Sequence, residues 1–282
     1  MHGIGNDYIY MDSLGSPTSV DIPEEIYPEL AGNVSDRHFG IGSDGLIMIL
    51  PSKNADFFMR IFNADGSEAQ MCGNGIRCVG KYVYEKGYTQ KKILEIETLA
   101  GIKKLELNVK GNVVESVTVD MGVPFLKRKD IPVKGDAEST MISEGIQVGD
   151  KFFLITSVGM GNPHCVVFVE DVNDFDVEKY GRILENHDLW PEKTNVEFIH
   201  VVDNKHLDMR VWERGSGETL ACGTGACAAA VASRINGYSE DEVEISLLGG
   251  KLSIRFDKKS NHVFMTGPAS FIADGVYYFN LK

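Results

Sequence analysis

Two cysteines in matching sequence contexts are the residues of this chain best suited to chemistry. Cys72 lies in MCGNGIRC and Cys222 lies in ACGTGACA, and each precedes an apolar pattern with helical spacing. A cysteine just before a helix faces unpaired N–H groups and the positive end of the helix dipole, which favour a thiolate and lower its pKa. One thiolate can remove a proton from one face of a carbon while an opposite thiol delivers a proton to the other face. The pair therefore predicts inversion of a carbon centre.

The glycines after each cysteine predict how a substrate is held. CGNG and CGTG let a ligand approach the backbone closely, and N–H groups at a helix N-terminus bind carboxylates. We expect both helix N-termini to grip one α-carboxylate, with the α-carbon between Cys72 and Cys222. Because the α-proton is weakly acidic, fixed dipoles in a site closed to water must stabilise the developing carbanion. The chemistry needs no metal, pyridoxal or other cofactor, and the thiols should titrate as a coupled pair.

The two cysteine contexts belong to a repeat that covers most of the chain. Residues 60–87 align without a gap with residues 210–237, at an offset of 150 residues. Three further pairs of segments extend the alignment. They are GIGND at 3–7 with GMGNP at 159–163, SDGLIMIL at 43–50 with TNVEFIHV at 194–201 (offset 151), and IETLAG at 96–101 with ISLLGG at 245–250 (offset 149). Such an extent indicates duplication of a whole domain.

Each copy contains several predicted strands and a central helix. Apolar runs between turn residues are typical of strands. They are LEIET, KKLELNV, VESVTVDM, VEISLL and KLSIRF. The helical pattern after each cysteine ends at Gly87 or Gly237, where a C-terminal cap belongs. A second helix is expected in each half, over residues 28–37 and 177–186. The predicted fold class is α/β (α+β), with two pseudo-symmetric domains that each wrap a strand-rich sheet or barrel around a central helix.

The repeat also predicts the domain boundaries. A length of 282 residues with 43% hydrophobic residues allows two domains of ordinary size. The N-terminal domain should comprise residues 1–120 plus about 269–282, because the final segment SFIADGVYYFN has no counterpart in the second copy. The C-terminal domain should comprise residues 121–268, with Pro124 and Pro132 flanking the hinge. We expect the active site in the cleft between the domains.

Composition restricts the classes of partner and compartment. A net charge of −13 repels nucleic acid and anionic membrane surfaces, so neither is an expected partner, and the substrate should be a small molecule. The sequence has no apolar run long enough to span a bilayer. The cysteine count is odd, at five, and the first residues do not resemble a signal peptide. These features predict a soluble protein with reduced thiols in the cytoplasm.

Other uses of the cysteines are weaker interpretations. Zinc ligation by Cys72, Cys78, Cys222 and Cys227 is disfavoured because five and four residues separate the members of each pair, with glycines between them. A structural disulfide is disfavoured in a reducing compartment. Cys78, Cys165 and Cys227 are better interpreted as buried small apolar residues.

The motifs MCGNGIRC, RIFNADGSE, GMGNPHC and ERGSGETLACGTGAC resemble the diaminopimelate epimerase family, and the resemblance covers essentially the whole chain. It implies a cofactor-independent enzyme of lysine and peptidoglycan biosynthesis that interconverts LL- and meso-2,6-diaminopimelate by a two-base thiolate/thiol mechanism. It also implies the two-domain fold described above and a homodimer.

The resemblance assigns roles to individual residues. Cys72 and Cys222 are the implied catalytic pair, with Cys222 as proton acceptor and Cys72 as donor in the LL-to-meso direction. The implied α-carboxylate site is the backbone of Gly73, Asn74, Gly223 and Thr224. The other implied substrate contacts are Asn6, Asn63, Asn162, Asn195, Glu213 and Arg214.

Differences between the two copies predict how a substrate is oriented. Asn63 and Glu213 are repeat partners that differ in charge, so the second copy can bind an ammonium group and perturb a nearby thiol. Arg214, with several asparagines, can fix the distal end of a long substrate. The family resemblance makes His164 a residue that tunes the pKa of the thiols. Its other interpretation is a polar side chain satisfied by its neighbours.

Three features depart from the family pattern. Some members have a glutamine contact where this chain has Gly45, and some have an interface tyrosine where it has Ala273. The sequence begins at MHGIGND, without the strand residues that usually precede this motif.

Two rival functions remain open. A proline or hydroxyproline racemase has similar paired cysteines but would not need the polar set of Asn162, Asn195 and Arg214. A non-enzymatic thiol module would bind zinc or switch by forming a disulfide.

Overall fold

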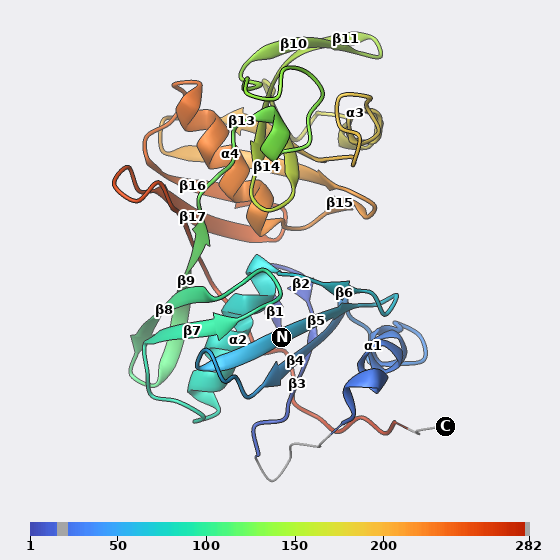
Figure 1. The fold of residues 1–282 in the computed structure, drawn as a ribbon, viewed down its shortest axis with the longest axis vertical. Helices are drawn as coiled ribbons and strands as arrows, with labels where there is room; N and C mark the ends of the chain where they lie inside the picture. Colours follow the sequence, from blue (N-terminus) through green and yellow to red (C-terminus); the bar gives the residue numbers. More distant parts are fainter. Residues whose placement is uncertain (16–21, 280–282) are drawn as a thin grey trace. The chain divides into compact units, whose positions relative to one another are not determined.

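The computed structural model describes residues 1–15 and 22–279 of the chain. It divides into two compact units, Met1–Val119 with Gly267–Lys282 (unit 1) and Asp120–Thr266 (unit 2), which Figure 1 shows as two lobes. Among the described residues, no helix is both long and apolar enough to cross a membrane. The two units repeat one architecture, so each is described by itself.

Unit 1 is built on strands in the order β3, β4, β5, β7, β8, β9. Strand pairs β3–β4 and β5–β7 are parallel and the others are antiparallel, while β6 pairs with the edge of β5 and β1 pairs with β2. The bounds are β1 His2–Gly3, β2 Asn6–Asp7, β3 Ile9–Asp12, β4 Gly45–Leu50, β5 Phe57–Asn63, β6 Glu68–Ala69, β7 Ile93–Glu97, β8 Lys103–Lys110 and β9 Val113–Gly122. The predicted strands LEIET, KKLELNV and VESVTVDM are confirmed as β7, β8 and β9.

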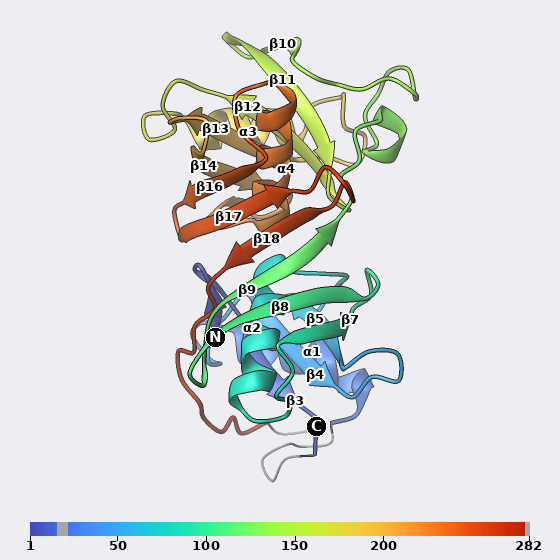
Figure 2. The same cartoon turned by 90° about the vertical axis from the view of Figure 1, so that its left-hand side faces the viewer.

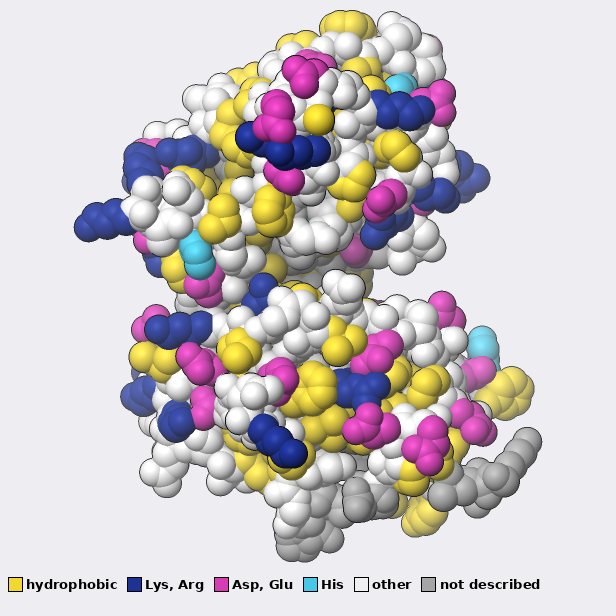
Figure 3. Space-filling model, viewed as in Figure 1, with side chains coloured by type: hydrophobic (Ala, Val, Ile, Leu, Met, Phe, Trp, Pro, Cys, Tyr) yellow, Lys and Arg dark blue, Asp and Glu magenta, His cyan; other side chains and the backbone are white. Residues whose placement is uncertain are grey.

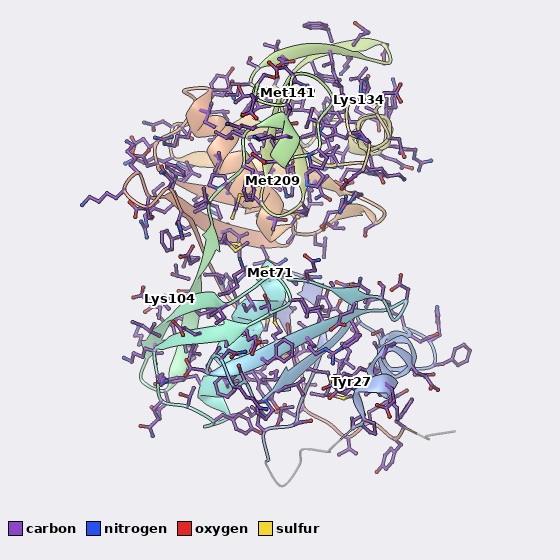
Figure 4. The ribbon with its side chains drawn as sticks, in the orientation of Figure 1. Tyr27, Met71, Lys104, Lys134, Met141 and Met209 are labelled. Atoms are coloured by element: carbon purple, nitrogen blue, oxygen red, sulfur yellow. The ribbon has the colours of Figure 1, made fainter. Side chains whose placement is uncertain are left out.

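Two helices cover opposite faces of the unit 1 strands. The central helix α2 (Gly73–Glu85) lies against β8 and the β1–β2 hairpin, and Figure 2 shows it among the strands. Helix α1 (Tyr27–Ser35) follows the 3₁₀ turn η1 (Glu24–Ile26) and packs on β4 and β5 from the other side. Tyr27, labelled in Figure 4, is buried and meets Phe62 of β5 edge to face at 5.6 Å.

Unit 2 continues the same plan with strands in the order β10, β11, β12, β13, β14, β16, β17, β18, and β15 pairs with β14. Pairs β12–β13 and β14–β16 are parallel. The bounds are β10 Glu144–Val148, β11 Lys151–Gly159, β12 Pro163–Phe168, β13 Asn195–Val201, β14 His206–Glu213, β15 Gly217–Thr219, β16 Glu242–Leu247, β17 Gly250–Phe256 and β18 Val263–Gly267, with a 3₁₀ turn η2 at Arg128–Asp130. The predicted strands VEISLL and KLSIRF are confirmed as β16 and β17.

Helix α4 (Gly223–Ile235) is the central helix of unit 2. It contacts β11, β12, β13, β16 and β17, and its small residues from Ala226 to Ser233 are buried among these strands. Helix α3 (Val177–Glu185) packs on β13 and β14 from the outside. The predicted α/β architecture, with strands around a central helix, is therefore confirmed in each unit. The predicted second helices over 28–37 and 177–186 correspond to α1 and α3.

Ion pairs repeat with the architecture. Arg60 of β5 binds Glu68 at 2.7 Å, and Arg210 of β14 binds Glu218 at 2.6 Å. Figure 3 shows acidic and basic side chains interspersed over the visible face of each unit. The equivalent pairs confirm the gap-free alignment of residues 60–87 with 210–237.

The strand register corrects the alignment of another pair of segments, residues 43–50 with residues 194–201. Ile47 pairs with Ile61 in unit 1, and Glu197 pairs with Val211 in unit 2. Because Ile61 and Val211 are repeat partners, Ile47 is equivalent to Glu197, an offset of 150 and not the 151 expected for this strand. The sequence comparison had paired Leu46 with Glu197, because both segments are apolar and a slip of one residue leaves their composition alike.

The terminal segment belongs to unit 1. Ser270 forms a bridge with His2, and Tyr277 and Phe279 pack on the core beneath α1. Ala273 lies in this segment outside any helix or strand. Asn280, the last residue of the predicted returning segment, lies outside the described residues.

Candidate active-site residues

Cys72 is the N-cap residue of α2. Its backbone is extended (φ −136°, ψ 114°), and its Sγ accepts a hydrogen bond from the backbone N–H of Gly75 at 3.3 Å. Met71, which precedes Cys72 in the sequence, is labelled in Figure 4 and marks this end of the helix. The predicted position of this thiol at a helix N-terminus is confirmed.

Asn6 connects Cys72 to the strand hairpin of unit 1. The thiol donates to Oδ1 of Asn6 at 3.3 Å, and Nδ2 of Asn6 donates to Asp44 at 2.7 Å. Asp44 also pairs with Arg37 at 3.1 Å. Asn6 is therefore held in place by a charged group and touches the sulfur directly.

The remaining candidates of unit 1 lie at the start of α2 and at the end of β5. Gly73 and Asn74 form the buried first turn of α2, whereas Asn63 ends β5 and donates to Ser67 Oγ at 3.0 Å. At Gly45, which pairs with Asn63, an added Cβ would lie 2.2 Å from the carbonyl oxygen of Phe62. Close packing against the backbone thus requires glycine at this position.

Cys222 has the same position in unit 2 and a different environment. It caps α4 with φ −124° and ψ 113°, and it is buried. Burial, followed by the charges of Glu213 and Glu197, raises the pKa of the Cys222 thiol well above its usual value, although a contact with Thr224 opposes this. The prediction of a lowered pKa is therefore wrong for Cys222: the N–H of Gly225 at the helix start does lower the pKa, but burial and the two carboxylates raise it by more.

A chain of polar contacts runs from Cys222 into the core of unit 2. The thiol contacts Thr224 Oγ1 at 3.5 Å, and Asn162 Nδ2 donates to the same oxygen at 3.5 Å. Oδ1 of Asn162 lies 2.9 Å from His164 Nε2, and His164 Nδ1 lies 2.7 Å from Glu197 Oε1. Four residues that we predicted from the sequence are therefore linked in series, with Glu197 at the inner end.

Asn195 and Arg214 form a separate contact in unit 2. Asn195 is buried; its Oδ1 accepts from the backbone N–H of Arg214 at 2.8 Å, and its Nδ2 donates to the carbonyl of Pro163 at 3.3 Å. The Arg214 guanidinium donates to the carbonyl of Glu192 at 2.9 Å. The Asn195 side chain thus holds the backbone at Arg214 through its oxygen and at Pro163 through its nitrogen.

Glu213 and Gly223 complete the candidates of unit 2. Glu213 ends β14 and accepts a hydrogen bond from Thr219 at 2.5 Å, and its charge acts on Cys222. Gly223 and Thr224 form the first turn of α4.

A model of the diaminopimelate epimerase family matches residues 1–127 and 156–272 of the sequence. The chain belongs to this family. Diaminopimelate epimerase from Acetivibrio thermocellus is 54% identical over 98% of this chain and 96% of its own length. The enzymes of the same name from Methanococcus maripaludis and Desulfovibrio desulfuricans are 53% and 50% identical, over 98% and 99% of this chain and 97% and 96% of their own lengths.

Solved structures share the fold of this diaminopimelate epimerase family member. A hydroxyproline epimerase from Agrobacterium vitis matches 95% of this chain and 86% of its own, with a TM-score of 0.65 and 15% identity. A phenazine biosynthesis protein of the PhzF family from Bacillus anthracis matches 88% of this chain and 86% of its own, with a TM-score of 0.63 and 20% identity. At these identities the likeness concerns the fold alone.

Sequence reasoning missed Glu197 in this family member. It lies within the apolar run VEFIHV of β13 and is fully buried, and burial raises the pKa of its carboxyl although His164 opposes the rise. The available signal was an acidic residue at a strand position whose repeat partner is Ile47. The one-residue slip in the alignment hid that signal.

The other three cysteines are fully buried. They are Cys78, Cys165 and Cys227. All five cysteines are described residues, and no disulfide joins any two of them. Within the described parts of the chain, no three His, Cys, Asp or Glu side chains are grouped so that they could hold a metal ion.

Proposed function

We propose that this chain is an isomerase that interconverts LL- and meso-2,6-diaminopimelate, with Cys72 and Cys222 as its two bases, in lysine and peptidoglycan biosynthesis. Membership of the diaminopimelate epimerase family supports the activity. The observation that carries the mechanism is the equivalent position of the two thiols, each capping the central helix of its unit. Two equivalent thiols from two repeated domains suit removal and delivery of a proton on opposite faces of one carbon.

The substrate α-carboxylate is proposed to bind at the N-termini of α2 and α4. The backbone N–H groups of Gly73, Asn74, Gly223 and Thr224 belong to the first turns, whose donors have no partner within the helix. As the Cα–H bond breaks, its proton moves to the Cys222 thiolate in the LL-to-meso direction. The Cys72 S–H bond then breaks and delivers its proton to the opposite face. The helix dipoles stabilise the charge that develops on the carboxylate.

Because the pKa of Cys222 is raised, we propose that substrate binding helps to form the Cys222 thiolate. Without substrate, burial and the nearby carboxylates favour the neutral thiol. A substrate ammonium group beside Glu213 would offset that negative charge and favour the thiolate. We propose further substrate contacts at three asparagines, which are Asn6, Asn63 and Asn162. Arg214, whose backbone is held by Asn195, is the proposed contact for the distal end of the substrate. His164 and Glu213 are the proposed pKa-tuning residues.

Turnover of LL-diaminopimelate in deuterated water tests the assignment. The parent should incorporate solvent deuterium at the inverted centre, whereas Cys72→Ser and Cys222→Ser should lose nearly all turnover, because each lacks one base. Cys227→Ala is the matched control, since this buried cysteine lies on α4 and is not a proposed base. Unchanged turnover in either serine variant would refute the two-base mechanism.

Proline racemase chemistry is the rival function within this fold. Arg214 with Asn195 favours a long substrate with a second polar end over a cyclic imino acid. Inversion of proline without inversion of diaminopimelate would overturn the proposal.

We also propose that the protein is a homodimer in the cytoplasm. The family resemblance supports the dimer, and two catalytic thiols must stay reduced to act, as in a reducing compartment. The molar mass in solution, measured by light scattering, tests the dimer.

A further inference from the structure

The His164–Glu197 pair is a buried ionisable cluster beside the Cys222 thiol. Both side chains are fully buried, and Glu197 Oε1 lies 2.7 Å from His164 Nδ1. Glu197 Oε2 has no hydrogen-bond partner among the described residues. Burial of an ionisable pair with one unsatisfied oxygen is costly and calls for a reason.

The duplicated fold does not itself require this pair. A Cβ added at Gly75 in α2 would meet Ile47 Cδ1 at 2.6 Å, and one added at Gly225 in α4 would meet Glu197 Oε1 at 2.6 Å. Ile47 thus fills in unit 1 the space beneath the helix N-terminus that Glu197 fills in unit 2. His164 is likewise equivalent to Tyr8, because the pairs β3–β4 and β12–β13 have the same register. Unit 1 thus forms the same fold with Ile47 and Tyr8 at these two positions.

The position of the protons on the pair sets the direction of a hydrogen-bond chain. The Nδ1–Oε1 contact needs one proton, and if His164 Nε2 also carries a proton, it donates to Asn162 Oδ1. Asn162 then donates through Nδ2 to Thr224 Oγ1. The Thr224 hydroxyl hydrogen is left to point at the Cys222 sulfur, 3.5 Å away, where it stabilises a thiolate.

We propose that Glu197 is a positioning residue for Cys222: it holds a proton on His164, and this proton orients Asn162 and Thr224 so that the threonine hydroxyl donates to the sulfur. The inference rests on the proposed function in taking Cys222 as a base. Glu197 does not touch the substrate in this proposal and acts through the three intervening side chains.

A simple charge effect of Glu197 would act in the opposite direction. The titratable groups that face Glu197 are His164 and Cys165 from β12, Glu213 from β14 and Cys222 at the start of α4. As an isolated negative charge, Glu197 would disfavour the Cys222 thiolate, so its removal would favour the thiolate. As a positioning residue, its removal should disfavour the thiolate, because the donor from Thr224 is lost. The sign of the effect therefore separates the two roles.

The test is the pH dependence of Cys222 alkylation by iodoacetamide in the full chain without substrate, followed by peptide mass spectrometry. Glu197→Gln keeps the size and hydrogen bonding of the side chain but lets the His164 proton sit on either ring nitrogen. We expect the midpoint of alkylation to move to higher pH, on the order of one pH unit. A midpoint that is unchanged or moves to lower pH would overturn the proposal.

Glu213→Gln is the matched control, because it removes a second carboxylate that acts on Cys222 and leaves the chain of contacts intact. Its midpoint should move to lower pH.

His164→Gln breaks the chain at its next member and should move the midpoint to higher pH; a shift to lower pH there would also overturn the proposal. Combining His164→Gln with Glu197→Gln should add little to either single change, and full additivity would show that the two residues do not act as one unit.

Two measurements keep this inference separate from the proposed function. Far-UV circular dichroism of each variant confirms folding before alkylation is measured. Alkylation needs no substrate, so a shift to higher pH would stand even if the parent failed to invert diaminopimelate. Inversion by the parent together with a shift to lower pH would sink the positioning role alone.

Discussion

The two equivalent cysteines have neighbours of different charge. Cys72 and Cys222 have the same extended N-cap backbone, but Cys72 bonds to Asn6 while Cys222 lies beside Glu213 and Glu197. A neutral amide group and a pair of carboxylates affect a neighbouring thiol in different ways. The two thiols are thus equivalent in position and differ in the groups that surround them.

Asn195 offers a prediction about stability at the residue scale. Asn195→Ala should lower the free energy of unfolding by about 1–3 kcal/mol, because the Arg214 N–H and the Pro163 carbonyl lose a buried partner. Urea denaturation measures the effect. Asn204→Ala is the control, since Asn204 is exposed and bonds to Glu240 at 2.8 Å; we expect a change within about 0.5 kcal/mol. Equal effects would contradict the structural role of Asn195.

Helices and strands approach closely in each unit because small residues face the sheets. A Cβ at Gly80 of α2 would lie 2.9 Å from Leu105 Cδ2 of β8, and a Cβ at Gly181 of α3 would lie 2.6 Å from Trp212 Cβ of β14. In α4, alanines serve the same purpose. Close contact fixes the position of a central helix and therefore of the thiol at its N-terminus.

Two glycine-to-alanine changes should have opposite signs at the scale of the element. Gly181→Ala should destabilise the protein by about 1–3 kcal/mol, because the base of the Trp212 side chain leaves no room for a methyl group. Gly32→Ala in α1 should stabilise it by up to about 1 kcal/mol, because its nearest contact is an ordinary 3.6 Å and alanine favours the helix. Thermal unfolding of both variants measures the difference. Stabilisation by Gly181→Ala would show that α3 is loosely packed.

At the scale of the whole molecule, duplication supplied two scaffolds that now carry different charges. Asn63 in unit 1 corresponds to Glu213 in unit 2, and Ile47 corresponds to Glu197. The ion pairs Arg60–Glu68 and Arg210–Glu218 are retained in both. The two ion pairs are common to both units, whereas these two positions differ in charge.

A substrate shared by both domains predicts protection from hydrogen exchange in both. Excess LL-diaminopimelate should slow exchange of amides in residues 73–76 and in residues 223–226, because the first turns of α2 and α4 would bind one carboxylate together. Hydrogen–deuterium exchange with mass spectrometry measures this. The turn at residues 110–113 is the internal control, and L-proline is the ligand control. Protection of one helix alone would contradict the proposal that both first turns bind the carboxylate.

The sequence by itself determined the duplication, the strands, the central helices and the position of Cys72 and Cys222 before them. These features depend on periodicity and turn residues that are local, so they can be read along the chain. The residues at the helix N-termini followed from the same motifs.

Only the tertiary structure decided what surrounds each thiol. Register, and not composition, placed Glu197 in the space that Ile47 fills in the other copy, and it joined His164, Asn162 and Thr224 into one chain. Burial and neighbouring charge depend on strands distant in sequence, and together they raise the pKa of the Cys222 thiol. The acidity of a side chain is therefore set by through-space neighbours, which a linear sequence does not specify.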